Sequence, residues 1–140
     1  MSSRPGKALR SRFVAALYEV FACALLLAGC ASKLVTEPAE ITLRAPGTTT
    51  NTLRLDASVD VRLDSGYSRT LKRGTTWKWV GSISQGEVWE PIDTVLTVEG
   101  RYVHEAYLVI SAPHLVGFYL PVEDAFLQLR TPIPLKFTTN

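Results

Sequence analysis

The side chains best suited to nucleophilic or metal chemistry in this 140-residue chain are two cysteines and two histidines. His104 is followed by Glu105, but a helical zinc motif needs a second histidine four residues later, and Leu108 occupies that position. A zinc site built on His104 and His114 would still need a third ligand, such as Glu105. The spacing of the histidines therefore predicts no metal site.

Acidic residues are the next candidates for catalysis. Glu87, Glu90 and Asp93 lie in one segment, and paired carboxylates are the groups that hydrolyse glycosidic bonds. Acids gather in this way by chance in many short chains. The sequence also lacks the Gly-x-Ser-x-Gly spacing of a serine nucleophile. We therefore expect a protein that is not an enzyme and that has no cofactor.

Aromatic side chains are the candidates for contacts with a ligand or a partner. Trp77, Trp79 and Trp89 lie within thirteen residues, and Phe118 and Tyr119 belong to an almost wholly apolar segment. One interpretation places them in the core, because Trp fills the interior of small β domains. The other places them on a binding surface, where Trp and Tyr are favoured, with Trp89 as the most exposed candidate because its neighbours are charged.

Cys30 follows an N-terminal segment in which three features agree. The stretch from Arg4 to Arg12 is basic, residues 20–28 form an apolar run of nine, and Leu27-Ala28-Gly29 places small residues before the cysteine. Nine apolar residues match a secretory signal core and fall short of the ~20 that a spanning helix needs. The segment resembles the signal peptide and lipobox of bacterial lipoproteins.

This resemblance implies a processing route and a location. A signal peptidase would recognise Leu27, Ala28 and Gly29 and cut before Cys30, which would carry covalent lipid. Two or more acyl chains anchor a protein firmly, whereas one holds it weakly. Because Ala31 rather than Asp follows the cysteine, the resemblance implies the periplasmic side of the outer membrane, with the inner membrane as the alternative.

Other interpretations of the N-terminal segment remain open. Glu19 interrupts the apolar stretch, and a carboxylate is costly in lipid. An uncleaved anchor helix over residues 13–29 and a buried core helix of a soluble protein are the two alternatives. If the signal is removed, Cys23 leaves with it and Cys30 is blocked by lipid. The remaining chain then holds together by packing alone in an oxidising compartment.

The part of the chain after the signal has a balanced charge. Residues 30–140 hold 11 basic and 12 acidic side chains, a formal charge of −1. A protein built to bind nucleic acid is therefore not predicted. The 111 residues from position 30 onward are enough for one domain and too few for two.

The elements that position these residues are predicted to be strands. Apolar and polar residues alternate from Leu53 to Leu63, which predicts a long strand with one buried face and a bend. Residues 102–110 predict a central strand, and turn signals recur about every 8–12 residues. We predict an all-β fold, a small antiparallel sandwich or barrel after an N-terminal signal helix. Residues 131–137, rich in proline, offer an edge for strand addition.

The predicted organisation has three parts: a lipoprotein signal peptide over residues 1–29, a lipid-anchored tether over residues 30–52, and a small β domain over residues 53–140. Within the tether, Ile41-Thr42-Leu43 can form a short first strand. Polar, turn-rich sequence near a lipid anchor is typical of a spacer.

The expected function follows from location more than from chemistry. Residues 71–137 are similar in pattern to small proteobacterial lipoproteins without an assigned activity. We expect an outer-membrane-anchored periplasmic lipoprotein that is non-catalytic and serves as an accessory or structural subunit of a cell-envelope assembly. Its partners would be the membrane, through the lipid, and an envelope protein. The alternative is a small-ligand or glycan-binding lipoprotein whose aromatic surface comprises Trp77, Trp79, Trp89, Phe118 and Tyr119.

Overall fold

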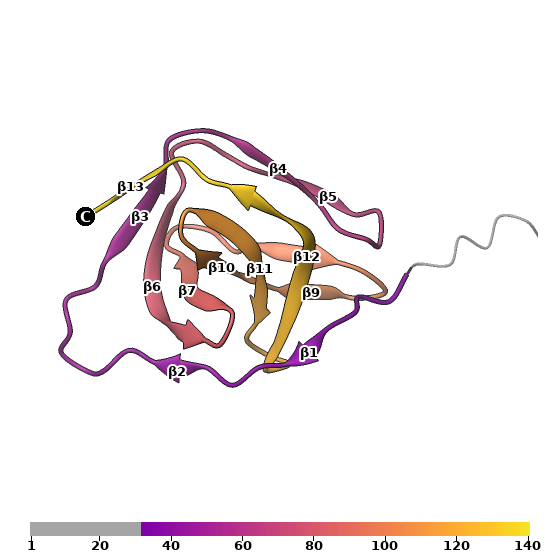
Figure 1. Cartoon of the computed structure of the whole chain (residues 1–140), viewed down its shortest axis with the longest axis horizontal. Coiled ribbons are helices and arrows are strands. Elements are labelled where there is room, and N and C mark those ends of the chain that lie inside the picture. The colour runs from indigo at the N-terminus through magenta and orange to yellow at the C-terminus, as the bar shows by residue number, and fades with distance from the viewer. Residues whose placement is uncertain (1–31) are drawn as a thin grey trace, which may run out of the picture. The chain divides into compact units, whose positions relative to one another are not determined.

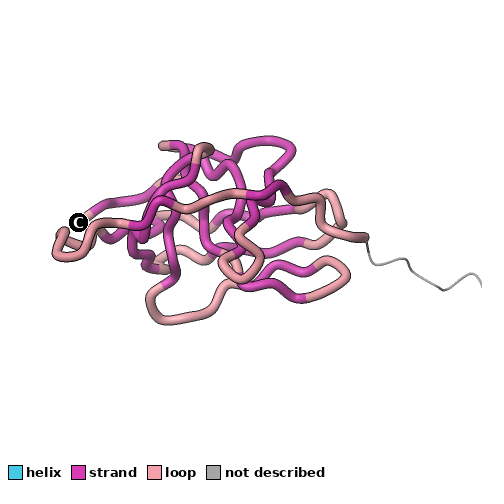
Figure 2. The backbone as a smooth tube through the Cα atoms, turned by 90° about the horizontal axis from the view of Figure 1, so that it is seen from below, coloured by secondary structure: helices cyan, strands magenta, loops and turns pink. Residues whose placement is uncertain are grey.

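Alternating apolar and polar residues give this chain strands, and the computed structural model describes residues 32–140 as strands joined by loops (Figure 2). All strand pairs in this range are antiparallel, so the predicted all-β class is confirmed. The predictions for the signal helix, its recognition residues Leu27, Ala28 and Gly29, and Cys30 lie outside the described residues. Among residues 32–140 no helix has the length and apolar character that crossing a membrane requires.

Most strands belong to one curled sheet, in the order β1-β12-β11-β10-β7-β6-β3-β13, with β2 also paired to β6 (Figure 1). Two further hairpins, β4–β5 and β8–β9, form separate two-stranded sheets. The strands are β1 (Glu37–Pro38), β2 (Thr42–Leu43), β3 (Thr52–Leu55), β4 (Val59–Arg62), β5 (Ser68–Leu71), β6 (Thr76–Ile83), β7 (Gly86–Pro91), β8 (Thr97–Glu99), β9 (Val103–Glu105), β10 (Tyr107–Ser111), β11 (His114–Leu120), β12 (Ala125–Pro134) and β13 (Phe137–Thr139).

The large sheet closes on itself because β12 and β13 are nearly continuous in the chain. β12 pairs with β11 along its length, and only two residues separate it from β13. β13 then pairs with β3, where Phe137 lies opposite Leu55. The pairings therefore run from β12 through β11, β10, β7, β6 and β3 to β13, which follows β12 in the chain but does not pair with it. Chain continuity rather than a strand pair closes the sheet, and β12 keeps an edge on which only the two-residue β1 pairs.

A main core lies on one face of the sheet, under the two hairpins. Its largest fully buried side chains include Leu55, Leu108, Leu115, Phe118 and Leu120. The hairpins β4–β5 and β8–β9 contribute further buried residues to this same cluster. Burial of apolar surface contributes ~25 cal/mol per Å². It is the main source of stability here, because residues 32–140 contain no cysteine and hence no disulfide.

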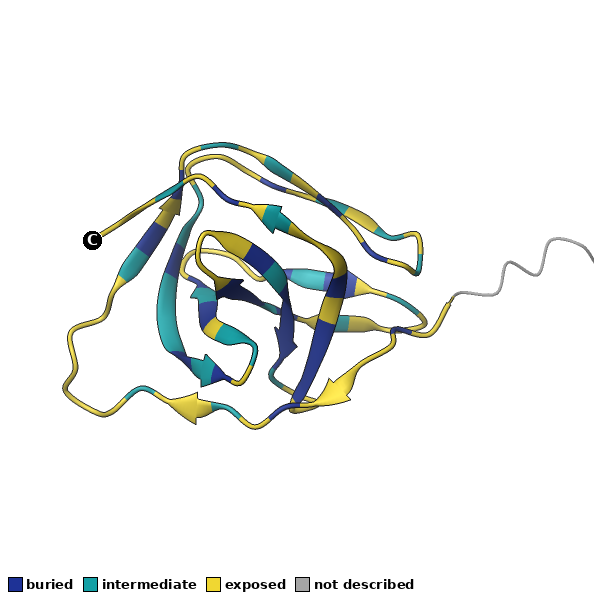
Figure 3. Cartoon of the chain, in the orientation of Figure 1, coloured by how far each residue is buried: buried dark blue, intermediate teal, exposed yellow. Residues whose placement is uncertain are grey.

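A second, smaller core lies on the opposite face. It contains Val88, Val109, Tyr119 and Phe126 from four neighbouring strands, and it is covered by Ala39 and the partly buried Ile41 of the N-terminal segment. Figure 3 shows the buried positions gathered on the inner strands and the exposed positions along the loop between β2 and β3. The inner strands β7, β10 and β11 are therefore covered on both faces.

The N-terminal segment is consequently more than the spacer that its composition predicts. Leu34 is 8% exposed and belongs to the main core, β1 pairs with β12, and β2 pairs with β6. The longest fully exposed run in this segment is the loop of residues 45–51. Within the segment predicted as a tether, Leu34, Ala39 and Ile41 pack on the sheet, and the short strand predicted at Ile41-Thr42-Leu43 corresponds to β2.

Two segments, each predicted to form a single strand, are divided into two strands in the structure. Residues 53–63 divide into β3 and β4, with the break at residues 56–58, so the expected bend also moves the chain from one sheet to another. Residues 102–110 divide at the buried Ala106 into β9 and β10. Alternation continues through the first break because both halves face the main core, where Leu53 and Leu63 are buried.

Candidate functional site

The aromatic side chains predicted as candidate contacts lie in the interior. The exposed fractions are 2% for Trp77, 4% for Trp89, 2% for Phe118 and 3% for Tyr119, and Trp79 is partly buried against the main core. The expectation of an exposed Trp89 is wrong because β7 is an inner strand, so residues on both of its faces are covered. Four of these five candidate side chains are therefore buried, so the five do not form an exposed aromatic surface.

The buried Tyr119 and the partly buried Tyr107 carry perturbed phenols, but their environment suits a structural role. Burial, followed by a hydrogen bond that the Tyr119 hydroxyl donates to Asp124 over 2.7 Å, raises the pKa of Tyr119 to about 12. Burial, followed by the charges of Glu90 and Glu105, raises the pKa of Tyr107 to about 12. Both phenols keep their protons near neutral pH, so neither can serve as a general base there.

The histidines and acids considered for catalysis occur in separate contacts. His104 Nδ1 lies 2.5 Å from Glu123 Oε1, whereas His114 is exposed at the start of β11. Glu90 pairs with Lys78 at 3.0 Å. Within residues 32–140 no three His, Cys, Asp or Glu side chains come together in a way that would hold a metal ion.

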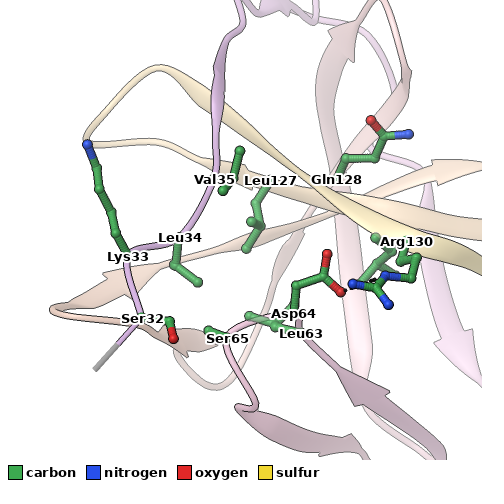
Figure 4. Close-up of a pocket in the computed structure, with 11 residues that line it drawn as sticks. Ser32, Lys33, Leu34, Val35, Leu63, Asp64, Ser65, Leu127, Gln128 and Arg130 are labelled. Carbon is green, nitrogen blue, oxygen red and sulfur yellow. Dashed lines mark ion pairs between the residues drawn. The ribbon is translucent and has the colours of Figure 1, made fainter. Parts of the chain in front are cut away.

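Two adjoining hollows along β12 form a concave surface, which we call the β12 cleft (Figure 4). The first has a volume of about 390 Å³ and lies among Ser32–Val35, Leu63–Ser65 and Leu127–Arg130. The second has a volume of about 460 Å³ and extends along β12 to Ile133. The cleft therefore opens where the N-terminal segment, the end of β4 and the middle of β12 approach one another.

The floor of the cleft is apolar and its rim is charged. Leu34, Leu63 and Leu129 are at most 8% exposed, so they line the cleft without offering much surface. Arg130 Nε and Asp64 Oδ1 lie 3.1 Å apart between the two hollows, and Figure 4 shows the two side chains turned toward each other. Their side chains are 79% and 66% exposed, and exposed pairs contribute little stability, so either can exchange its partner at low cost.

The backbone of β12 is unpaired on the side that borders the cleft. β1 pairs only with Ala125 and Phe126, and no other described strand pairs with β12 on that side. Backbone groups alternate sides along a strand, and the Leu127 carbonyl lies toward Gly117 of β11. The N–H and C=O of Gln128 therefore point away from β11, toward the cleft. An unpaired donor and acceptor beside an apolar floor suit the addition of an extended peptide.

The sequence gives a partial signal for this cleft. The expected edge over residues 131–137 overlaps its far end, whereas Gln128 and Leu34 carry no pattern that marks them. The chain matches no model of a protein family, no curated protein and no solved structure. Function is therefore inferred from the geometry of residues 32–140 and from the sequence of residues 1–31.

Proposed function

We propose that this chain is a lipid-anchored protein of the bacterial cell envelope, and that its folded part acts by binding, as an accessory or structural subunit of an envelope assembly. In this proposal a signal peptidase recognises Leu27, Ala28 and Gly29 and cuts before Cys30, which carries the lipid. Ala31 after the cysteine favours the periplasmic side of the outer membrane. The proposal includes no catalytic step and no cofactor.

The observation that supports this proposal most directly is the place where the fold begins. Ala31–Asn140 forms a compact unit, and Leu34 is already part of its main core. A cut before Cys30 would therefore leave every described strand in place. A cut a few residues later would remove Leu34, whose side chain fills the space beside Gly100.

The anchor is tested by replacing each cysteine in turn. We would express the tagged wild type, Cys30→Ser and Cys23→Ser in a Gram-negative host, fractionate the cells and measure the mass of the N-terminal peptide. Wild type and Cys23→Ser should start at an acylated Cys30 and remain with the membranes, and Cys30→Ser should do neither. An unmodified Cys30 in the wild type would disprove the anchor, as would the same loss in both variants.

The binding role is tested at the β12 cleft. A photo-crosslinking amino acid would replace Gln128 in intact cells, and Thr49, in the exposed loop between β2 and β3, would be the control position. We expect Gln128 to yield a discrete covalent complex with an envelope protein that Thr49 does not yield. Absence of any complex from Gln128, or the same products from both positions, would count against the cleft as the binding site.

A second variant separates a specific contact from proximity. Arg130→Glu places a carboxylate opposite Asp64 and breaks the only ion pair of the described residues in the cleft. Because the pair is exposed, the fold should change in stability by less than ~1 kcal/mol. The Gln128 crosslink should nevertheless weaken if the partner contacts this rim.

A further inference from the structure

We propose that the folded part has a membrane-facing surface, an inference that rests on the lipid anchor proposed for Cys30. This N-terminal face consists of Lys33, Val35, Arg101, Tyr102 and Val122, and its residues Lys33 and Val35 also border the β12 cleft. Its occupant is the headgroup region of the bilayer in which the lipid is inserted. The face would fix how the folded part is oriented on the membrane.

Exposed apolar side chains are concentrated at this end of the folded part. Seven large apolar side chains in the described range are well exposed, and three of them, Val35, Tyr102 and Val122, belong to this face. Their exposed fractions run from 67% for Tyr102 to 87% for Val35. Large apolar side chains gathered on a surface mark a site of contact.

Contacts between distant segments join these residues into one face. Leu34 packs beside Gly100, and a hollow of about 300 Å³ is lined by Lys33, Thr36, Arg101 and Tyr102 among others. The pair between His104 and Glu123 holds the turn that carries Val122 against β9. In Figure 1 the described part of the chain begins beside the tip of the β8–β9 hairpin.

The position of this face relative to Cys30 favours a bilayer. Only Ala31 separates Cys30 from Ser32. Consecutive Cα atoms are ~3.8 Å apart, so the Cα atom of Cys30, which would carry the lipid on its side chain, lies within ~8 Å of the Cα atom of Ser32. Val35 and Lys33 of the face follow within three residues. An anchored lipid therefore brings this end of the folded part, rather than the opposite end, to the headgroups.

The chemistry of the face also fits headgroups. Tyr is enriched at the membrane–water boundary, and Lys and Arg extend their charged ends to phosphates while their stems cover apolar surface. Lys33 and Arg101 form no ion pair with another described residue, and no acidic side chain lines the hollow between them. Both cations are therefore available to lipid phosphates.

The size of the face argues against a protein as its main occupant. Stable protein interfaces involve ~20–30 residues on each partner, whereas this face has five. A small face suffices for a bilayer contact, because the anchor supplies an effective concentration of the order of mM. The face adds orientation to an attachment that the lipid already provides.

The test measures how close individual side chains lie to lipid. The lipidated protein would be purified from membranes as Tyr102→Cys, Val122→Cys or Val95→Cys, labelled with a fluorophore, and placed in vesicles of phosphatidylethanolamine and phosphatidylglycerol with nitroxide-labelled headgroups. Val95 is the matched control, an exposed valine in the loop between β7 and β8 (60% exposed, against 77% for Val122). Circular dichroism would confirm that each variant is folded.

We expect nitroxide lipids to quench the fluorophores at positions 102 and 122 and to leave the one at position 95 close to its value in unlabelled vesicles. Equal quenching at positions 95 and 122 would overturn the face while leaving the anchor intact. The mass of the N-terminal peptide is a separate readout. A peptide without acyl chains would overturn the anchor, and the face with it.

Discussion

At the scale of single residues, Gly117 shows how closely β11 and β12 approach. A Cβ at this position would lie 2.3 Å from the Leu127 carbonyl oxygen and 2.4 Å from the Phe126 ring. Gly117→Ala should therefore lower the free energy of unfolding by about 1–3 kcal/mol, the usual cost of overpacking. Urea unfolding measures this, with Thr50→Ala in the exposed loop as the control. If Gly117→Ala had the same free energy of unfolding as the wild type, β11 and β12 would be able to move apart without loss of stability.

Tyr119 predicts a pH dependence at the alkaline end. Burial, with the Asp124 hydrogen bond second, raises the pKa of Tyr119 from 10.0 to about 12, so the folded state holds the phenolic proton more tightly than the unfolded chain does. The resulting stability is complete below pH 10 and is lost as the pH rises toward about 12. Tyr119→Phe should lose less stability than the wild type over this window.

Exposure provides the control for this titration. Tyr102 is 67% exposed, so Tyr102→Phe removes a tyrosine hydroxyl without disturbing the core and serves as the control variant. Chemical denaturation at several pH values between 9 and 12 measures all three proteins over the range set by the two pKa values. An identical alkaline loss in Tyr119→Phe and the wild type would contradict the role assigned to this phenol.

At the scale of elements, the N-terminal segment offers a matched pair of neighbours. Leu34 is 8% exposed and Val35 is 87% exposed. Leu34→Ala should lower the free energy of unfolding by about 2 kcal/mol, near the lower end for a buried leucine because the site is at the edge of the core. Val35→Ala should change it by less than ~0.5 kcal/mol. Hydrogen exchange of residues 32–43 should rise only in Leu34→Ala, and equal effects of the two variants would contradict the packing of this segment.

The sequence predicts some of these strands and hairpins but not the way in which the segments between them pack. Alternation and turn residues predict the hairpins β4–β5, β6–β7 and β10–β11, because period-two burial and turn chemistry are local properties. The change of sheet at residues 56–58 is not predictable from alternation, since both halves face one core. The composition around Leu34 and Ala39 is that of a spacer, and only the tertiary fold reveals that these side chains cover the sheet.

The candidate site is predictable only in part, for similar reasons. Trp89 has charged neighbours, which favours exposure, yet β7 lies inside the sheet with both faces covered. Gln128 follows the same alternation as its neighbours, and its importance comes from the short length of β1, which leaves the edge of β12 unpaired. Sequence patterns indicate which face of a strand is buried but not which edge has a partner.

At the scale of the whole molecule, closure of the sheet depends on hydrogen bonds between β13 and β3. Thr52 and Asn140 exchange both backbone hydrogen bonds, and the Asp56 N–H donates to Lys136. Because such pairs alternate along an antiparallel ladder, the Thr138 N–H points at Arg54 and the Thr139 N–H points away. The two adjacent threonines therefore differ in what a proline would remove.

This difference gives a test of closure. Thr138→Pro should lower the free energy of unfolding by at least ~1 kcal/mol, because it removes the bond to β3 and the hydroxyl that donates to Asp56 over 2.8 Å. Thr139→Pro keeps both and should lower it by a smaller amount. Thermal unfolding of the two variants decides the matter, and equal melting temperatures would show that β13 does not hold the sheet closed.

Because β13 is the last strand to be synthesised, β3 must wait for its pairing partner. Asp56 and Thr138 lie 82 residues apart, so β3 leaves the ribosome long before its last neighbour exists. At synthesis rates of 5–20 residues per second this delay is roughly 4–16 s. An edge strand left open for seconds is a template for aggregation. In a chain that is exported, as proposed above, the interval lasts until β13 has also crossed the membrane, and a chaperone that holds the unfolded chain would protect β3 during this time.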